Sequence, residues 1–164
     1  MKLGCQFQLS SGIWIYTSLA DDFQLLPNFI LKELANPSSG ETICFVADLK
    51  AQTKFLPMLQ LTRDHFGAIT PSSVYRTKTY NEKVGGDYRS AHLKCWAFDW
   101  PHKVKNDIER AQIRDWWKAL CREFSEIGAI NYYSNGFHFE IGSDTNYGYK
   151  EFIVRDYRGK KGDW

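Results

Sequence analysis

Two short stretches carry most of the structural information in this chain: Ser90-Ala-His-Leu-Lys-Cys-Trp-Ala-Phe-Asp99 and, after a helix-length gap, Gly136-Phe-His-Phe-Glu140. Between them they supply two imidazoles, His92 and His138, and the carboxylate of Asp99. Two imidazoles and one carboxylate suit a zinc ion, and three protein ligands leave a fourth coordination position open for water. That layout is typical of a catalytic zinc site, so the pattern favours a hydrolase.

Both stretches contain a predicted strand, because the apolar, aromatic-rich runs 95–100 and 129–141 are typical of extended backbone. If Asp99 and His138 lie on neighbouring strands, and His92 comes from the loop before the first, the three converge on one ion at roughly 2.0–2.2 Å each. A mixed carboxylate and imidazole set favours zinc over calcium or magnesium, which prefer oxygen ligands.

The spacing of these residues also fits an interpretation without metal. A chain with four histidines often has two that make only core hydrogen bonds, and His65 and His102 are expected at the surface or at helix ends. Aromatic residues, including Trp96, Trp100 and Tyr132-Tyr133, would then form a glycan-binding surface. The spacing alone leaves both interpretations open.

The clearest predicted helix runs from about Asp107 to Ile127. Its apolar residues recur at three- and four-residue steps on one face. Asn106 is a suitable N-cap with Glu109 three residues later, and Gly128 suits a left-handed position after the C-terminus. The tryptophans of this helix are therefore expected in the core.

Weaker patterns precede these elements. Residues 3–17 predict an early strand or hairpin turned at 10–12, and a short helix containing Phe29 to Leu34 is expected to end at 36–40. A further helix is expected at 53–66. Helices first, then strands interrupted by a helix, predict an α+β fold built on a small, mostly antiparallel sheet.

Composition predicts one domain, residues 1–164, because 43% hydrophobic residues suffice for a single core. The formal charge of +2 comes from 21 basic and 19 acidic residues that are well mixed, so no electrostatic footprint of a nucleic-acid binder is present. The basic run 155–161 is interpreted as a solvated tail. We expect a monomer.

Hydropathy gives no segment approaching the ~20 apolar residues of a membrane span, and no export signal is visible at the N-terminus. The cysteines lack the paired spacing of a cysteine zinc site or a disulfide framework and are expected to be isolated thiols. They are Cys5, Cys44, Cys95 and Cys121.

Further motifs lie upstream of His92: Ser73-Val-Tyr-Arg76, Asn81 and Gly85-Gly86. Together with the two stretches above, they resemble the zinc D-Ala-D-Ala carboxypeptidase and L-alanyl-D-glutamate endopeptidase family of cell-wall peptidases. That family has the pattern S-x-Y-R, N, G-G, S-x-H-x-x-G-x-A-x-D and a late His. The resemblance covers about residues 50–142 and implies a fold like that of hedgehog and the D-Ala-D-Ala peptidases.

Position by position, the resemblance implies that His92, Asp99 and His138 bind zinc. It implies that Arg76 holds the substrate's carboxylate, or the oxyanion that forms at the peptide carbonyl, a task suited to a fixed bidentate cation. Ser90 would orient the loop before the first ligand or donate to a bound substrate. Taken alone, Arg76 would be interpreted as an ordinary surface ion pair.

The chain departs from the family pattern at two positions. Cys95 replaces the glycine between the motif histidine and aspartate, and it is expected to share a strand face with Asp99 and to be buried. Asn135 stands where many members have a carboxylate, and an amide cannot act as a general base. Glu140, on the same face as His138, is the available carboxylate. It is either the general base or the residue that holds the imidazole by its second nitrogen, and we favour the second role.

The resemblance therefore implies a zinc peptidase that cleaves a bond involving a D-amino acid in bacterial peptidoglycan, as a carboxypeptidase or an endopeptidase. Such a protein would act on the cell wall as a phage lysis or tail enzyme, or on wall fragments as a cytoplasmic recycling enzyme. The alternative is a non-catalytic module of the same fold that keeps zinc and binds peptidoglycan without turnover.

Overall fold

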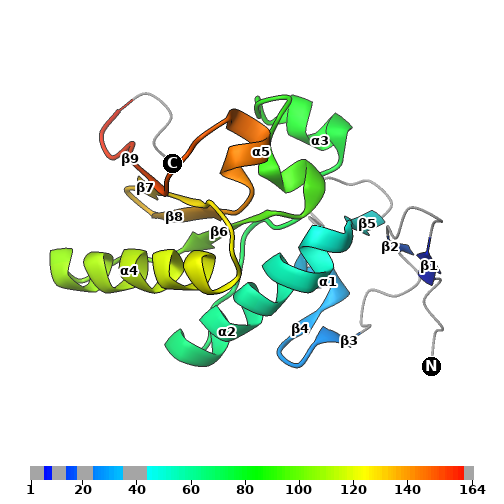
Figure 1. The fold of residues 1–164 in the computed structure, drawn as a ribbon, viewed down its shortest axis with the longest axis horizontal. Helices are drawn as coiled ribbons and strands as arrows, with labels where there is room; N and C mark the ends of the chain where they lie inside the picture. The colour runs from blue at the N-terminus through cyan, green and yellow to red at the C-terminus, as the bar shows by residue number, and fades with distance from the viewer. Residues whose placement is uncertain (1–5, 9–13, 18–23, 35–43, 161–164) are drawn as a thin grey trace.

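The computed structural model describes residues 6–8, 14–17, 24–34 and 44–160, which fold as α+β (Figure 1). The strands are β1 (Gln6–Gln8), β2 (Trp14–Thr17), β3 (Gln24–Leu26), β4 (Phe29–Ile30), β5 (Cys44–Ala47), β6 (Ala97–Pro101), β7 (Ala129–Tyr133), β8 (Gly136–Glu140) and β9 (Ile153–Asp156). The helices are α1 (Leu31–Leu34), α2 (Leu56–Phe66), α3 (Lys78–Lys83), α4 (Asp107–Glu123) and α5 (Ser143–Tyr147), with a π-helical turn at Ala51–Phe55 and a 3₁₀ helix at Ala91–Lys94. Among these helices, none is long and apolar enough to cross a membrane.

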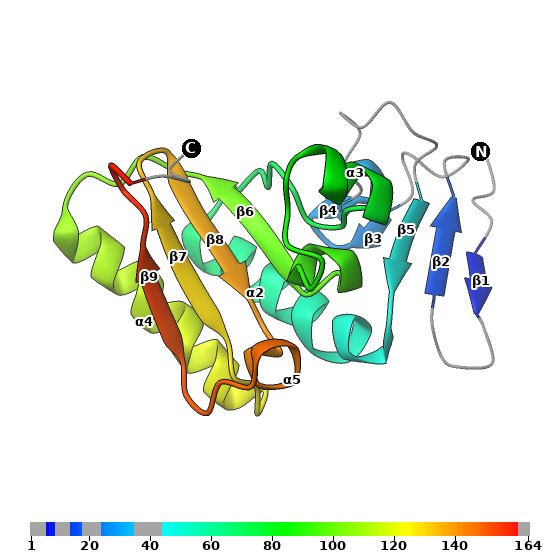
Figure 2. The same cartoon turned by 90° about the horizontal axis from the view of Figure 1, so that it is seen from above.

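The central feature is a four-stranded sheet in the order β6-β8-β7-β9. Strand β8 is antiparallel to both β6 and β7, and only the β7–β9 pair is parallel. The predicted small, mostly antiparallel sheet is confirmed. Figure 2 shows the four strands side by side with α4 behind them, and the separate sheet β1-β2-β5 at the other end of the molecule.

The two faces of this sheet differ in chemistry because side chains alternate along each strand. One face carries aromatic residues that pack on α4: Trp117 lies edge-on to Phe98 and to Phe139, with ring centroids 5.6 Å and 5.3 Å apart. Figure 1 shows α4 along this face, with α3 and α5 on the opposite side. The second face is left to polar side chains.

Helix α4 begins as predicted and ends four residues early. The Asn106 side chain accepts a hydrogen bond from the Glu109 N–H at 2.9 Å. The helix ends at Glu123, and Ser125 takes the left-handed conformation, with φ 55°, that was expected of Gly128. That expectation was wrong because the chain turns back toward the sheet sooner than the apolar pattern suggests.

Glycine is needed at position 128 for a reason other than a left-handed conformation. A Cβ at this position would lie 2.6 Å from the carbonyl oxygen of Glu140 and 2.5 Å from Sγ of Cys121. Glycine therefore permits the chain to pass between α4 and the end of β8, next to a residue of the functional site.

The early elements agree in part with the sequence. Strands β1 and β2 form an antiparallel pair, as predicted, and the helix expected at 53–66 is present. Phe29 and Ile30 lie in strand β4 and not in a helix, because a turn at Pro27-Asn28 folds them back onto β3. The predicted turn at 10–12 and helix end at 36–40 lie outside the described residues.

Three predictions for the second half need correction. The run 129–141 is a hairpin, β7 and β8, and not one strand. Strand β6 begins at Ala97, so Cys95 lies before it. The run 155–161 begins inside β9, which pairs in parallel with β7. The solvated-tail interpretation was therefore wrong for its first residues.

Candidate metal centre

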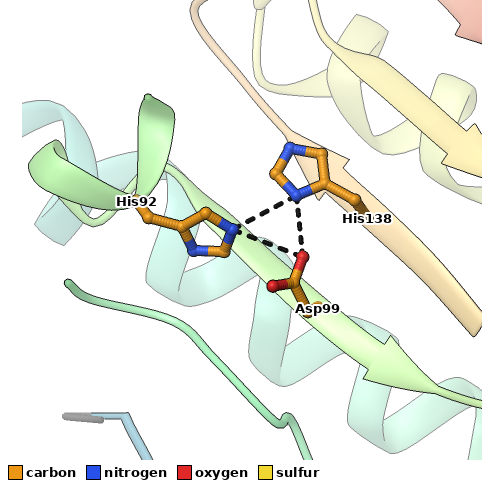
Figure 3. A group of neighbouring side chains, drawn as sticks. All are labelled: His92, Asp99 and His138. Atoms are coloured by element: carbon orange, nitrogen blue, oxygen red, sulfur yellow. Dashed lines mark hydrogen bonds and ion pairs between the residues drawn. The ribbon is translucent and has the colours of Figure 1, made fainter. Parts of the chain in front are cut away.

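His92 is held by the 3₁₀ helix that precedes β6 and is almost fully buried. Its Nδ1 lies 2.7 Å from the carbonyl oxygen of Val74. A carbonyl can only accept, so Nδ1 carries the proton and Nε2 has a free lone pair. That lone pair points toward Asp99 and His138, the other two predicted ligands (Figure 3).

Asp99 and His138 are direct cross-strand partners in the β6–β8 ladder. Oδ1 of Asp99 lies 2.8 Å from Nδ1 of His138 and 3.3 Å from Nε2 of His92, and the two nitrogens are 3.2 Å apart. Ligand atoms around a tetrahedral zinc, at bonds of about 2.0–2.2 Å, lie roughly 3.3–3.6 Å from one another. The three atoms therefore need to separate only slightly to hold an ion.

The second nitrogen of His138 is also occupied. Nε2 lies 3.2 Å from Oε2 of Glu140, whose other oxygen accepts a hydrogen bond of 3.0 Å from the Ser143 hydroxyl. When Nε2–H donates to Glu140, Nδ1 presents a lone pair to the same point as Nε2 of His92 and Oδ1 of Asp99. Three buried acceptors that face one another repel unless a cation or a proton lies between them, so the donor set fits a metal.

The electrostatics of the group agree with this geometry. Burial disfavours the charged form of Asp99, yet the neighbouring histidines hold its pKa well below the usual range. Burial also opposes protonation of His138, but hydrogen bonds to Asp99 and Glu140 outweigh it and raise its pKa to about 9. Asp99 thus supplies a negative charge to the group.

Arg76 contacts this group through the other oxygen of Asp99. Its Nη2 lies 2.5 Å from Oδ2 of Asp99, its Nε donates to the Ser73 hydroxyl at 2.8 Å, and its backbone N–H donates to the carbonyl of His92. Arg76 therefore fixes Asp99 so that only Oδ1 faces the two imidazoles.

A cavity of about 640 Å³ opens onto the three ligands. This volume is in the range of small-molecule and peptide sites. The predicted site residues Arg76, Ser90 and Glu140 all line it. The structure thus brings every predicted site residue to one place, although the hydroxyl of Ser90 does not cap the 3₁₀ helix that follows it.

Comparison with known proteins assigns the chain to a family. The family model for peptidase M15 matches residues 27–138. The chain belongs to the peptidase M15 family. No curated protein and no solved structure matches it. Family membership confirms the resemblance and supports a metallopeptidase in general.

In this M15 chain, the departure at Cys95 has a structural explanation. Cys95 adopts the left-handed conformation, with φ 57° and ψ 44°, at the end of the 3₁₀ helix and two residues before β6 begins. Glycine takes this conformation without strain, which accounts for the glycine in the family pattern. The thiol is fully buried and lies outside the group of potential ligands. The expectation that Cys95 shares a strand face with Asp99 was wrong, whereas its burial is confirmed.

The second departure lies away from the centre of this M15 site. Asn135 is exposed in the turn between β7 and β8 and is not among the residues that line the cavity. Glu140 is therefore the non-ligand carboxylate in direct contact with a predicted ligand, His138.

The upstream motif residues shape the loop before His92. The Asn81 amide donates to the carbonyl of Asp87 at 2.9 Å, and Gly85 has a φ of 72°. A Cβ on Gly86 would lie 2.2 Å from Oδ1 of Asn81, so this position requires glycine.

The glycan-binding surface of the interpretation without metal is contradicted by burial for three of its four named aromatic residues. Trp96, Trp100 and Tyr132 are 6%, 6% and 7% exposed, whereas Tyr133 is half-buried and lines the cavity. His65 stacks on a tryptophan of α4 and His102 contacts Glu109, which places both outside the metal group, as expected.

Arg155 is one of the cavity residues that sequence reasoning missed. It lies on β9, past the end of the family match, and its Nη1 donates to Oδ1 of Asn131 at 3.0 Å. The signal for its strand was the short apolar run Phe152-Ile-Val154 before Arg155, which the surrounding charged residues obscured.

Proposed function

We propose that this chain is a zinc-dependent peptidase that hydrolyses a peptide bond involving a D-amino acid in peptidoglycan. The observation that supports it best is the convergence of three lone pairs, from His92, Asp99 and His138, at the floor of an open cavity. The second nitrogens of both histidines face the Val74 carbonyl and Glu140, a pattern typical of metal-ligating imidazoles.

When bound, a zinc ion supplies a Lewis acid that polarises the scissile carbonyl and lowers the pKa of water to ~7. The chain itself fixes the geometry. Arg76 immobilises Asp99 through an ion pair, and its guanidinium also borders the cavity. There it is placed to stabilise the negative charge that develops on the carbonyl oxygen. Ser90 lines the same cavity and is positioned to donate to the substrate backbone.

We propose that Glu140 is a positioning residue. Both of its oxygens are engaged, one by His138 and one by Ser143, and the carboxylate is almost fully buried. Burial opposes its ionisation, but the hydrogen bond and charge of His138 lower its pKa, so it stays a carboxylate that accepts from the imidazole.

The substrate class is tested with two kinds of wall peptide. The zinc-loaded protein is incubated with a stem peptide that ends in free D-Ala-D-Ala and, separately, with a cross-linked stem dimer. Mass analysis of the products identifies the bond. Release of D-alanine indicates a carboxypeptidase, and internal cleavage indicates an endopeptidase. If neither substrate changes while zinc is bound, the hydrolytic proposal fails.

A second candidate is a peptidoglycan-binding module without turnover. It is favoured by Asn135, which stands in an exposed turn where many relatives have a carboxylate, and by the occupied oxygens of Glu140. This candidate predicts zinc-dependent sedimentation with purified walls and no released fragments.

A further inference from the structure

One row of directly paired residues crosses the whole sheet and runs through the metal site. Asp99 on β6 is paired with His138 on β8, His138 with Asn131 on β7, and Asn131 with Arg155 on β9. Directly paired residues project from the same face of a sheet. Arg155 therefore lies on the metal face, two strands from His138, or about 10 Å at a strand spacing of about 4.8 Å.

The guanidinium of Arg155 has neutral partners. Nη1 donates to Oδ1 of Asn131, and the group lies 5.2 Å from the ring centroid of Tyr149. Among the described residues, no carboxylate is in ion-pair contact with Arg155. By contrast, Arg76, Arg110 and Arg158 each pair with an aspartate. Arg155 is thus a half-buried cation that lines the cavity and has no ion-pair partner among the described residues, although the charge of Glu140 acts on it at longer range.

The charge of the cavity lining also matters for the substrate. Three arginines and three acidic groups line it: Arg76, Arg89, Arg155, Asp87, Asp99 and Glu140. These charges cancel when the histidines are neutral, so a bound divalent cation makes the cavity positive overall. A positive cavity attracts an anionic peptide.

We infer that Arg155, oriented by Asn131, binds a carboxylate of the peptide substrate at a subsite separate from the metal. This inference rests on the proposed peptidase function and assigns to Arg155 the carboxylate-binding role that the family resemblance gave to Arg76. Nη2 of Arg76 is already committed to Asp99, whereas Arg155 makes no ion pair among the described residues, and its donors outside the contacts with Asn131 and Tyr149 can hold a carboxylate. An extended peptide advances about 3.4 Å per residue. A carboxylate bound at Arg155, about 10 Å from His138, therefore lies within about three residues of the scissile bond.

The test uses two stem peptides that are identical except that one acidic residue carries either a free carboxylate or a carboxamide. Cleavage is followed with the zinc-loaded full chain and with Arg155→Gln, Arg155→Lys and Arg158→Gln. The last is a matched control, because Arg158 belongs to the same segment and pairs with Asp156 outside the cavity. Zinc content and melting temperature of each variant establish that the fold and the metal site are retained.

The wild type and Arg158→Gln are expected to prefer the free acid by about 10-fold or more in kcat/KM. The reason is that a carboxamide cannot replace the charged contact between the substrate carboxylate and Arg155. Arg155→Gln should lose this preference through KM, and Arg155→Lys should retain part of it. An equal preference in the wild type and Arg155→Gln overturns the inference and leaves the peptidase proposal intact.

If the wild type cleaves neither peptide, the peptidase proposal fails, and calorimetric binding of the same pair decides on Arg155. Tighter binding of the acid by the wild type but not by Arg155→Gln supports the inference. Equal binding of both peptides contradicts it.

Discussion

Arg76 and Asp99 form an ion pair in which Nη2 lies 2.5 Å from Oδ2, while Oδ1 of the same carboxylate faces both histidines. The two oxygens of Asp99 therefore have separate tasks. One is fixed by a cation of the protein, and the other is presented to a cation that the site is built to hold. The arginine thus contributes to the metal centre without being a ligand.

Arg76→Gln should weaken zinc binding about 10- to 100-fold, the range found when outer partners of metal ligands are removed. The loss is expected because Asp99 becomes free to rotate. Competition with a chromophoric chelator measures the affinity. An unchanged affinity with a raised KM would instead give Arg76 the substrate-binding role alone.

His138→Ala should abolish stoichiometric zinc binding, because it removes one of three ligands and the partner of both Asp99 and Glu140. His102→Ala is the matched control, since His102 contacts Glu109 outside the metal group. Elemental analysis of both purified variants is the measurement. Equal zinc in the two proteins would refute the ligand assignment.

Glu140→Gln should retain zinc at an affinity reduced about 10- to 100-fold, with turnover at saturating zinc reduced by a similar factor. An amide still reaches His138 but lacks the charge that holds the imidazole. A general base would behave differently: turnover would fall by about 10²–10⁴-fold while zinc affinity hardly changed. Ser143→Ala, which frees one oxygen of Glu140, should show the positioning effect in weaker form.

Removal of the metal should destabilise the fold. At a free zinc concentration 100 times Kd, binding contributes about 2.7 kcal/mol, and for a chain of this length this corresponds to roughly 5–10 °C in Tm. Thermal melting with and without chelator measures the difference. The melting temperature of His138→Ala should not respond to the chelator, and an equal response in this variant would show that the effect does not arise at the site.

Cys95 gives a prediction about backbone strain. Cys95→Gly should change the free energy of unfolding by less than about 1 kcal/mol, since relief of the left-handed conformation offsets the lost burial of the thiol. Cys95→Val should destabilise by more than about 2 kcal/mol, because a β-branched side chain is poorly tolerated at positive φ and in a filled core. Urea unfolding compares the two variants, and equal effects would exclude strain as the cause.

The parts of the site that could be predicted are those that depend on residues close together in the sequence. Asp99 and His138 were expected in strands because the runs 95–100 and 129–141 are apolar and rich in aromatic residues, and the structure pairs the two residues directly. Asn106 caps α4 because capping depends on a few consecutive residues. The positions of His92 and Arg76 came from the family motif and not from periodicity.

Other features depend on pairing between distant segments and escaped prediction for that reason. Arg155 lies in a strand because β9 pairs with the open edge of β7, and the local sequence does not reveal this pairing. Gly128 is required by the Glu140 carbonyl twelve residues later, and not by the helix before it. The Cys95 conformation is set by the turn from the 3₁₀ helix into β6.

The central claim is that His92, Asp99 and His138 hold a zinc ion that hydrolyses wall peptides, and one preparation tests it most directly. Zinc content of protein purified without chelator is determined first, and the same sample is then incubated with purified peptidoglycan beside His138→Ala. We predict one zinc per chain and peptide fragments that the variant does not release. A chain that binds no zinc, or fragments released equally by the variant, would contradict the account.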